Sequence, residues 1–202
     1  MKILCVGRNY AEHARELGNA VPEDPVIFSK PDTALLKNGD DFYLPEFSQD
    51  IHHEIELVIR INKMGKKIQE KFAHTYYNEI GVGIDFTARD MQSKLKSKGL
   101  PWELAKAFDS SAVLGDFIQP DMERKEPIAF RLDKNGTTVQ QGITTDMIFS
   151  FDQIVAFVSN YFTLKVGDLI YTGTPSGVGR VVAGDLLTGF IGDKQMLSCR
   201  VR

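Results

Sequence analysis

The chain has 202 residues, of which 43% are hydrophobic and 25% are charged, and its formal net charge is −3 at pH 7. A chain of this length and composition can form one globular domain with a sizeable core. Because the net charge is slightly negative and no basic cluster stands out, we expect neither nucleic acid nor a membrane as a partner.

Nothing in the sequence points to export. The first apolar run, Lys2–Val6, is too short for a signal peptide, and no run approaches membrane-spanning length. Cys5 and Cys199 lie at opposite ends of the chain without a CxxC spacing, so we expect reduced thiols. The expected location is the cytoplasm.

The first predicted elements are a strand and a short helix. Residues Lys2–Val6 form an apolar run typical of a strand. Residues Tyr10–Leu17 fit a helix with Asn9 as N-cap and Gly18 just past its end. A proline-containing loop over 19–25 follows. Further strands are predicted at 26–29, 53–61 and 79–85.

Two glutamates lie one residue apart in the strand predicted at 53–61. Because side chains alternate between the faces of a strand, Glu54 and Glu56 point the same way, roughly 7 Å apart along the backbone. A third acid from another strand end would complete an all-oxygen site for Mg²⁺ or Mn²⁺. Taken alone, the pair is more often a solvated strand face. The other face is predicted to be core: Ile55, Leu57, Ile59 and Ile61.

Asp85 is the candidate for the third acid, because it ends the strand predicted at 79–85. Thr87 with Asp90 three residues later resembles a capping box, so a helix is predicted to begin here and to end near Lys98-Gly99.

On that helix, Arg89 and Gln92 share one face. An arginine beside a metal suits a substrate carboxylate, because its planar fork binds carboxylates bidentately. A surface ion pair is the alternative explanation of Arg89.

Turn signals organise the C-terminal half. Asn135-Gly136 predicts a hairpin, and Phe151–Tyr161 predicts an amphipathic helix with Ser150 as a possible cap. The remaining segments are predicted to be strands separated by glycine-containing turns. No repeat, linker or low-complexity tract marks a domain boundary, so we expect a mostly β fold with a few helices.

Six motifs occur in a fixed order along the chain. They are Gly7-Arg8-Asn9-Tyr10-Ala11-Glu12-His13, Lys30-Pro31, Glu54-Ile55-Glu56, Asp85-Phe86-Thr87-Ala88-Arg89-Asp90, Lys98-Gly99-Leu100-Pro101-Trp102 and Gly173-Thr174-Pro175-Ser176-Gly177-Val178-Gly179. Together they resemble the fumarylacetoacetate hydrolase family, and most closely its short single-domain members that act on acylpyruvates and oxaloacetate.

The resemblance implies a mixed β fold (β-rich α+β), a rolled β-sandwich with a few short helices. It implies one catalytic domain over residues 1–202, in which residues 1–25 form an N-terminal strand and a lid helix. It also implies Mg²⁺ or Mn²⁺ held by three carboxylates, here Glu54, Glu56 and Asp85, and usually a homodimer.

The resemblance further assigns a catalytic dyad. A His-x-x-Glu pair after Gly-Arg-Asn-Tyr activates water in the family that the chain resembles, and the matching residues here are His13 and Glu16. On a helix these side chains lie three apart and can touch, so the carboxylate can orient the imidazole. From the residues alone, casual pairing on an amphipathic surface helix is the favoured explanation, and the resemblance shifts the preference to the catalytic one.

Four further residues are predicted at the site. Lys106 matches the family lysine that stabilises negative charge on the substrate, although its apolar neighbours would also suit a surface lysine. Thr174 lies in a glycine-rich turn that suits a small anionic ligand, lacks the Gly-Lys-Ser/Thr of a P-loop, and could otherwise be a plain loop. Arg8 and Lys30, from the first two motifs, are assigned to substrate binding together with Arg89 and Gln92.

These features predict a metal-dependent hydrolase of small 2-oxo acids. A 2-oxo acid can chelate the metal, which stabilises the enolate formed when a bond beta to the keto group breaks. With water activated by the dyad, an acylpyruvate is cleaved to pyruvate and a carboxylic acid. The alternatives are oxaloacetate decarboxylation, oxaloacetate keto–enol tautomerisation, or a hydratase or isomerase step in aromatic degradation. A non-enzymatic metal-binding module is the less favoured hypothesis.

Overall fold

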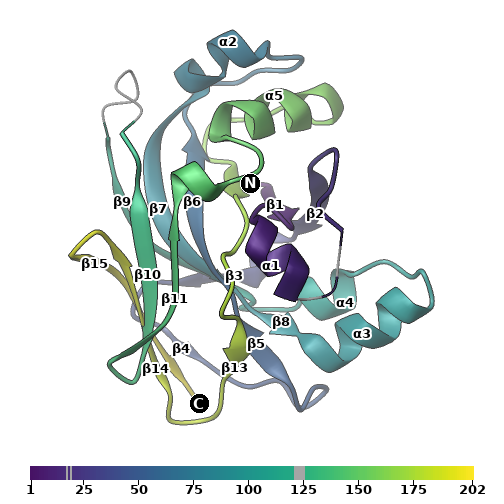
Figure 1. The fold of residues 1–202 in the computed structure, drawn as a ribbon, viewed down its shortest axis with the longest axis vertical. Helices are drawn as coiled ribbons and strands as arrows, with labels where there is room; N and C mark the ends of the chain where they lie inside the picture. The colour runs from purple at the N-terminus through teal and green to yellow at the C-terminus, as the bar shows by residue number, and fades with distance from the viewer. Residues whose placement is uncertain (17, 19, 121–125) are drawn as a thin grey trace.

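The computed structural model describes residues 1–16, 18, 20–120 and 126–202, and strands dominate these residues (Figure 1). A seven-stranded sheet has the spatial order β2 (Val26–Lys30), β1 (Ile3–Gly7), β12 (Leu169–Tyr171), β6 (Ile55–Ile61), β7 (Tyr77–Asp85), β9 (Ala112–Ile118) and β3 (Leu35–Lys37). A five-stranded sheet has the order β11 (Thr137–Ile143), β10 (Ala129–Lys134), β14 (Leu186–Ile191), β15 (Lys194–Val201) and β4 (Asp41–Phe42). A small sheet joins β13 (Gly179–Arg180), β5 (Ile51–His53) and β8 (Thr87–Ala88).

The helices are short and lie around the strands (Figure 1). They are α1 (Ala11–Glu16), α2 (Glu70–Ala73), α3 (Arg89–Ser97), α4 (Glu103–Lys106) and α5 (Phe151–Tyr161), with 3₁₀ turns at Asp32–Ala34, His74–Tyr76 and Thr144–Asp146. None of the helices in the described residues combines the length and the apolar composition needed to cross a bilayer. The predicted mixed, strand-rich fold with curled sheets and few short helices is confirmed.

Strand β6 is buried on both faces. Ile55, Leu57 and Ile59 pack into the main core with residues of the five-stranded sheet such as Leu197. Val58 packs into a second hydrophobic cluster together with residues of β1 and β12. A strand buried on both sides cannot move without disturbing two packed layers, so β6 is a rigid support for what it carries.

Close backbone approach explains the glycines that precede Asp85. A Cβ on Gly83 would lie 2.5 Å from the ring of Tyr171 and 2.8 Å from the carbonyl oxygen of Val113. The register between β7 and β9 also shifts between Gly81 and Gly83. Strand β7 can therefore pack tightly where it delivers Asp85 to the end of the sheet.

Several predicted boundaries are confirmed. Helix α5 begins after Ser150, whose hydroxyl accepts a hydrogen bond from Gln153 N in a full capping box. Asn135 and Gly136 have φ angles of 54° and 80°, which suit the predicted hairpin. The strand predicted at 53–61 is interrupted at Glu54, which lies between β5 and β6.

Two predicted caps are wrong. Helix α1 begins after Tyr10, whose carbonyl accepts from Ala14 N, while the Asn9 carboxamide donates to the carbonyls of Phe149 and Thr172. Helix α1 is described only to Glu16, so its predicted end at Leu17 and the loop residue Asn19 lie outside the described residues.

The capping box predicted at Thr87 does not form either. Thr87 belongs to β8, helix α3 begins at Arg89, and its N-cap Ala88 provides no side-chain hydrogen bond. The Thr87 hydroxyl instead accepts from Lys106. Asp90 accepts from the Ser48 hydroxyl, so its carboxylate holds a neighbouring loop rather than the predicted cap.

Candidate active site

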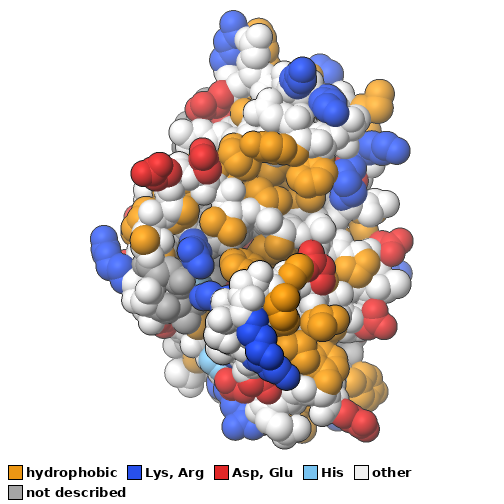
Figure 2. Space-filling view, turned by 90° about the vertical axis from the view of Figure 1, so that its right-hand side faces the viewer, with side chains coloured by type: hydrophobic (Ala, Val, Ile, Leu, Met, Phe, Trp, Pro, Cys, Tyr) orange, Lys and Arg blue, Asp and Glu red, His pale blue; other side chains and the backbone are white. Residues whose placement is uncertain are grey.

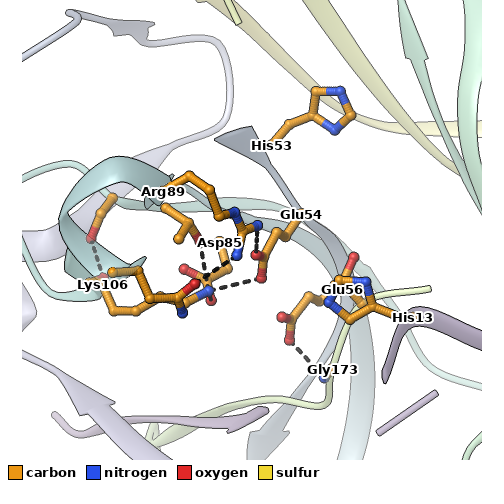
Figure 3. A network of polar contacts seen from close by, with 12 residues as sticks. His13, His53, Glu54, Glu56, Asp85, Arg89, Lys106 and Gly173 are labelled. Carbon is orange, nitrogen blue, oxygen red and sulfur yellow. Dashed lines mark hydrogen bonds and ion pairs between the residues drawn. The ribbon is translucent and has the colours of Figure 1, made fainter. Parts of the chain in front are cut away.

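Three buried carboxylates converge where β6 and β7 lie side by side (Figure 3). Glu54 precedes β6, Glu56 lies within it, and Asp85 ends β7, with the Asp85 N–H donating to the carbonyl of Glu54. One oxygen from each carboxylate lies within 4.8 Å of the others. Their exposed fractions are 4%, 2% and 0%. The alternative of a solvated strand face is therefore excluded for Glu54 and Glu56.

Cationic side chains surround two of these acids. Lys106 Nζ lies 2.8 Å from Glu54 Oε2, 2.7 Å from Asp85 Oδ2 and 2.6 Å from Thr87 Oγ1. The guanidinium of Arg89 forms an ion pair with the other oxygen of Glu54. Lys106 is 4% exposed, so it is not the surface lysine that its apolar neighbours would allow.

These ion pairs favour the charged states of their members. Burial opposes ionisation of Glu54, but Lys106 and Arg89 outweigh it and hold the pKa of Glu54 well below its ordinary value. Burial likewise favours the neutral amine of Lys106, but Asp85 and Glu54 raise the pKa of Lys106 above its ordinary value. Glu54 and Lys106 are therefore a carboxylate and an ammonium at neutral pH.

Glu56 differs from its two neighbours. Its Oε2 accepts a 2.7 Å hydrogen bond from Gly173 N, and no lysine or arginine among the described residues forms an ion pair with it. Burial and the adjacent charges of Asp85 and Glu54 raise the pKa of Glu56 well above its ordinary value. A buried carboxylate without a cationic partner, beside two further carboxylates, fits a bound divalent cation with oxygen ligands.

Lys30 lies behind this cluster. Its Nζ lies 2.8 Å from Asp85 Oδ1 and donates to Ser111 and to the carbonyl of Lys106. Its side chain is fully buried and does not line the pocket. Lys30 therefore holds Asp85 and the end of α4, which does not fit the predicted contact with substrate.

The mouth of the pocket is cationic. Arg8, Arg89 and Gln92 line it as predicted from the sequence, and Arg89 donates a 2.8 Å hydrogen bond to Gln92 Oε1. Lys96 lines it as well and was not predicted, although it lies seven residues after Arg89 on the same face of α3. Burial lowers the pKa of Lys96, and the nearby charges of Arg8 and Arg89 lower it further.

The predicted dyad lies on α1. His13 Nδ1 lies 3.0 Å from Glu16 Oε2, and His13 is only 4% exposed. The other Glu16 oxygen accepts a 3.1 Å hydrogen bond from Gly177 N, which connects α1 to the turn at 173–179. His13 lines the pocket that contains the acids, so a casual surface pair is excluded.

The turn at 173–179 closes the pocket beside the acids. Thr174 lines it and is 3% exposed. Gly173 has a φ angle of 103°, and a Cβ there would lie 2.6 Å from the Cβ of Asn9. Only glycine combines this backbone with that approach, and this conformation directs the Gly173 N–H to Glu56.

Nine of the predicted residues therefore line one pocket, while Glu16 and Lys30 support it from outside. The residues not predicted are Val6, Gly7, Phe28, Lys96 and Trp102. Gly7 and Trp102 belong to two of the six sequence motifs, but no function was predicted for either residue. Phe28 alternates with its neighbours on a short strand, and only its position beside Lys106 in space reveals it.

Comparisons with known proteins agree with this arrangement. A family model described as fumarylacetoacetate (FAA) hydrolase C-terminal matches residues 2–202. An oxaloacetate tautomerase of Escherichia coli (strain K12) is 43% identical over 189 residues, covering 93% of this chain and 86% of that protein. A mitochondrial oxaloacetate tautomerase of Mus musculus is 44% identical over 185 residues, covering 91% of this chain and 83% of that protein.

Solved structures give the same result. The structure of fumarylpyruvate hydrolase from Pseudomonas aeruginosa in complex with Mn²⁺ and pyruvate matches with a TM-score of 0.92 and 37% identity, covering 100% of this chain and 89% of that one. The predicted resemblance is confirmed over almost the whole sequence, and relatives of this kind are named as enzymes. The chain belongs to the fumarylacetoacetate hydrolase family.

Proposed function

We propose that this protein is a divalent-metal-dependent enzyme that interconverts the keto and enol forms of oxaloacetate. The observation that carries the proposal is Glu56, a buried carboxylate without a cationic partner among the described residues, in a pocket that also contains a histidine base. The oxaloacetate tautomerases at 42–44% identity support this substrate. This activity is the alternative in the sequence-based prediction rather than its first choice.

Glu54, Glu56 and Asp85 would hold the metal. Mg²⁺ and Mn²⁺ both prefer carboxylate oxygens, and the Mn²⁺ in the fumarylpyruvate hydrolase structure supports an ion of this class. The bound cation supplies Lewis-acid stabilisation of negative charge on a substrate oxygen. Lys106 adds a second positive charge to the same region, since it contacts both Glu54 and Asp85.

The pocket mouth would bind and orient the substrate. Arg89 presents a planar guanidinium whose position is fixed by Glu54 and Gln92, and such a group suits a carboxylate. Arg8 and Lys96 add positive charge at the pocket lining. A dicarboxylate such as oxaloacetate would thus be attracted at both of its ends.

His13 would move the proton. A carboxylate can only accept, so His13 Nδ1 donates to Glu16 and the lone pair remains on Nε2. Nε2 accepts the proton from C3 as the C–H bond breaks, and then returns it to the 2-oxo oxygen, which yields the enol. The reverse sequence yields the keto form, and Glu16 stabilises the imidazolium in between.

Acylpyruvate hydrolysis is the second candidate, and the same dyad favours it. His13 would take a proton from a water that attacks the distal carbonyl, and the C–C bond then breaks to give pyruvate and a carboxylic acid. Fumarylpyruvate hydrolase supports this activity at 37% identity. Decarboxylation of oxaloacetate needs no base, because no proton leaves the substrate.

The test is a substrate panel read by product identity. The purified protein is given enol oxaloacetate, acetylpyruvate and fumarylpyruvate with Mg²⁺, with Mn²⁺ and with a chelator. We expect the enol absorbance to decay faster than it does spontaneously, and only when metal is present. Pyruvate release from an acylpyruvate without faster enol decay would replace the first candidate by the second. Inactivity on all three would refute both.

We also propose a homodimer. β2 is an edge strand, and unpaired strand edges are normally covered. The face that includes β2, α4 and α5 carries several apolar patches (Figure 2). Ile27, Phe157, Tyr161 and Phe162 line a groove there. Light scattering coupled to size exclusion is expected to give twice the 22.6 kDa chain mass, and an active monomer would refute the assembly.

A further inference from the structure

Gln140, on strand β11, connects the two large sheets and contacts Thr174 of the pocket lining, and no local pattern in the sequence identifies it. It is 2% exposed. Its Oε1 lies 3.0 Å from Ile55 N and 2.9 Å from His53 Nδ1. Its Nε2 lies 2.9 Å from Thr174 Oγ1 and 3.0 Å from the Pro175 carbonyl oxygen. The carboxamide therefore uses all four of its hydrogen-bonding positions.

Two backbone groups determine which way this carboxamide faces. The Ile55 N–H can only donate, so the atom beside it is the oxygen. The Pro175 carbonyl can only accept, so the atom beside it is the nitrogen. In the reversed orientation the carboxamide NH₂ would face the Ile55 N–H, which is also a donor. The carboxamide oxygen would face the Pro175 carbonyl oxygen, which is also an acceptor.

The directions of the other two hydrogen bonds follow. His53 must donate from Nδ1, and Thr174 Oγ1 must accept from Gln140. The Thr174 proton must then point elsewhere. The Pro175 carbonyl is 3.5 Å from Thr174 Oγ1, which is too long to hold a hydroxyl proton well. Thr174 lines the pocket, so its proton is available to an oxygen inside it.

We propose that Gln140 is a positioning residue that makes the Thr174 hydroxyl a hydrogen-bond donor to an oxygen of the substrate. The identity of that substrate, a 2-oxo acid, rests on the proposed function. Without Gln140 the hydroxyl can rotate and donate to protein oxygens, so a bound carboxylate or keto oxygen competes for it. Gln140 also holds Ile55, between Glu54 and Glu56, and the experiment must separate these two effects.

A double-mutant cycle separates them. The affinity for pyruvate is measured by calorimetry with Mn²⁺ present for Gln140→Met, Thr174→Val and the double variant. Each single change is expected to weaken binding roughly tenfold, as for one hydrogen bond to a charged group. The double variant is expected to bind no more weakly than Thr174→Val. Additive losses would overturn the proposal, because Gln140 would then act through Ile55.

Two further variants serve as controls. Gln141→Met changes the neighbouring glutamine, which is exposed on the opposite face of β11, and is expected to leave pyruvate affinity unchanged. Thr174→Ser keeps the hydroxyl and is expected to keep the sensitivity to Gln140→Met. Thermal unfolding of each variant shows whether it is folded.

A measurement without turnover keeps the inference independent of the proposed function. The side-chain NH₂ signals of Gln140 are recorded by ¹H–¹⁵N NMR in the wild type, in Thr174→Val and in Thr174→Ser. One proton is expected to shift in the valine variant and to keep its position in the serine variant. If the Gln140 NH₂ signals have the same chemical shifts in Thr174→Val as in the wild type, the proposal is overturned, even if the enzyme is active. If they shift but oxaloacetate is not a substrate, only the proposed function fails.

Discussion

Two buried acids lie at opposite ends of the parallel strand pair β1 and β12, and they differ in how they are stabilised. Asp168, just before β12, accepts from Lys2 N and Lys165 N and forms an ion pair with the Lys2 ammonium. Glu56, beside the far end of β12, receives one backbone hydrogen bond, from Gly173. Both are nearly inaccessible, at 1% and 2% exposure.

The pKa of each acid shows what the difference means. Burial raises the pKa of Glu56, and the acids around it raise it further. At Asp168, burial acts in the same direction, but the bonds from Lys2 outweigh it and lower the pKa. Burial alone therefore does not distinguish a structural acid from a functional one. Their partners do, and the acid without a cationic partner is the one to which a bound metal ion has most to contribute.

The strongest test of this contrast is Glu56→Gln. The amide removes a metal ligand, so we expect Mn²⁺ affinity and metal-dependent turnover to fall by roughly 10²-fold or more. The metal-free protein should unfold at the same temperature or higher, because the repulsion from Asp85 and Glu54 is relieved. Calorimetric titration and thermal unfolding measure both. Unchanged Mn²⁺ affinity would contradict the assignment. Glu79→Gln, on the same sheet, is the control.

His13→Ala tests whether the pocket that contains Glu56 also contains a base. Tautomerisation and acylpyruvate hydrolysis should both fall by roughly 10²–10⁴-fold, as is typical of a positioned base. Metal-dependent decarboxylation of oxaloacetate should persist, since it needs no proton transfer from substrate. Equal loss of all three activities would mean that His13 holds substrate instead. His52→Ala is the matched control, because His52 also pairs with an acid, Asp50, but lies outside the pocket.

A smaller effect is expected at the pocket mouth. Lys96→Ala and Arg8→Ala should each raise the KM for oxaloacetate roughly five- to tenfold, because one partly solvated ionic contact to the distal carboxylate is lost. The KM for acetylpyruvate, which lacks that carboxylate, should change little. Lys94→Ala removes an exposed lysine of the same helix that does not line the pocket, and should have no effect. Equal KM changes for both substrates would assign these cations to the 2-oxo acid end.

Asp168→Asn changes the acid whose carboxylate already has hydrogen-bond and ionic partners, and it should affect stability alone. The amide NH₂ would face Lys165 N or the Lys2 ammonium, at a cost of about 1–3 kcal/mol of unfolding free energy, with kcat unchanged. The pKa of Asp168 is lower in the folded chain, so its contribution is complete above about pH 4 and is lost as the pH falls further. Chemical denaturation at pH 7 and pH 3 should show the difference between the proteins shrinking. A difference that grows in acid would contradict this account.

Local patterns together with the family resemblance predicted the acids but not the residues around them. The two-residue spacing placed Glu54 and Glu56 together, although Glu54 lies between β5 and β6 and only Glu56 lies on β6. The predicted strand end placed Asp85 beside them. Thr87 was misassigned as a cap because its actual partner, Lys106, is nineteen residues away and no local spacing reveals it. Gln140 was missed for the same reason, since its four partners lie on segments remote in sequence. Lys96 could have been found from the helical period alone.

The pairing of β1 with β12 also governs when the site can form during synthesis. β1 can pair with β2 early, but Ile3 also pairs with Leu169, and Asn9 donates to the carbonyl of Thr172. The first strand therefore acquires its second neighbour, β12, only after residues 169–172 have been made. Contacts this distant in sequence close late, because the loop entropy must be overcome first. A nascent chain that ends before Gly173 therefore has its acids but lacks the turn that contacts Glu56 and Glu16. We expect competence for metal binding and turnover to appear only after the turn at 173–179 has been made and has packed against Glu56 and Glu16.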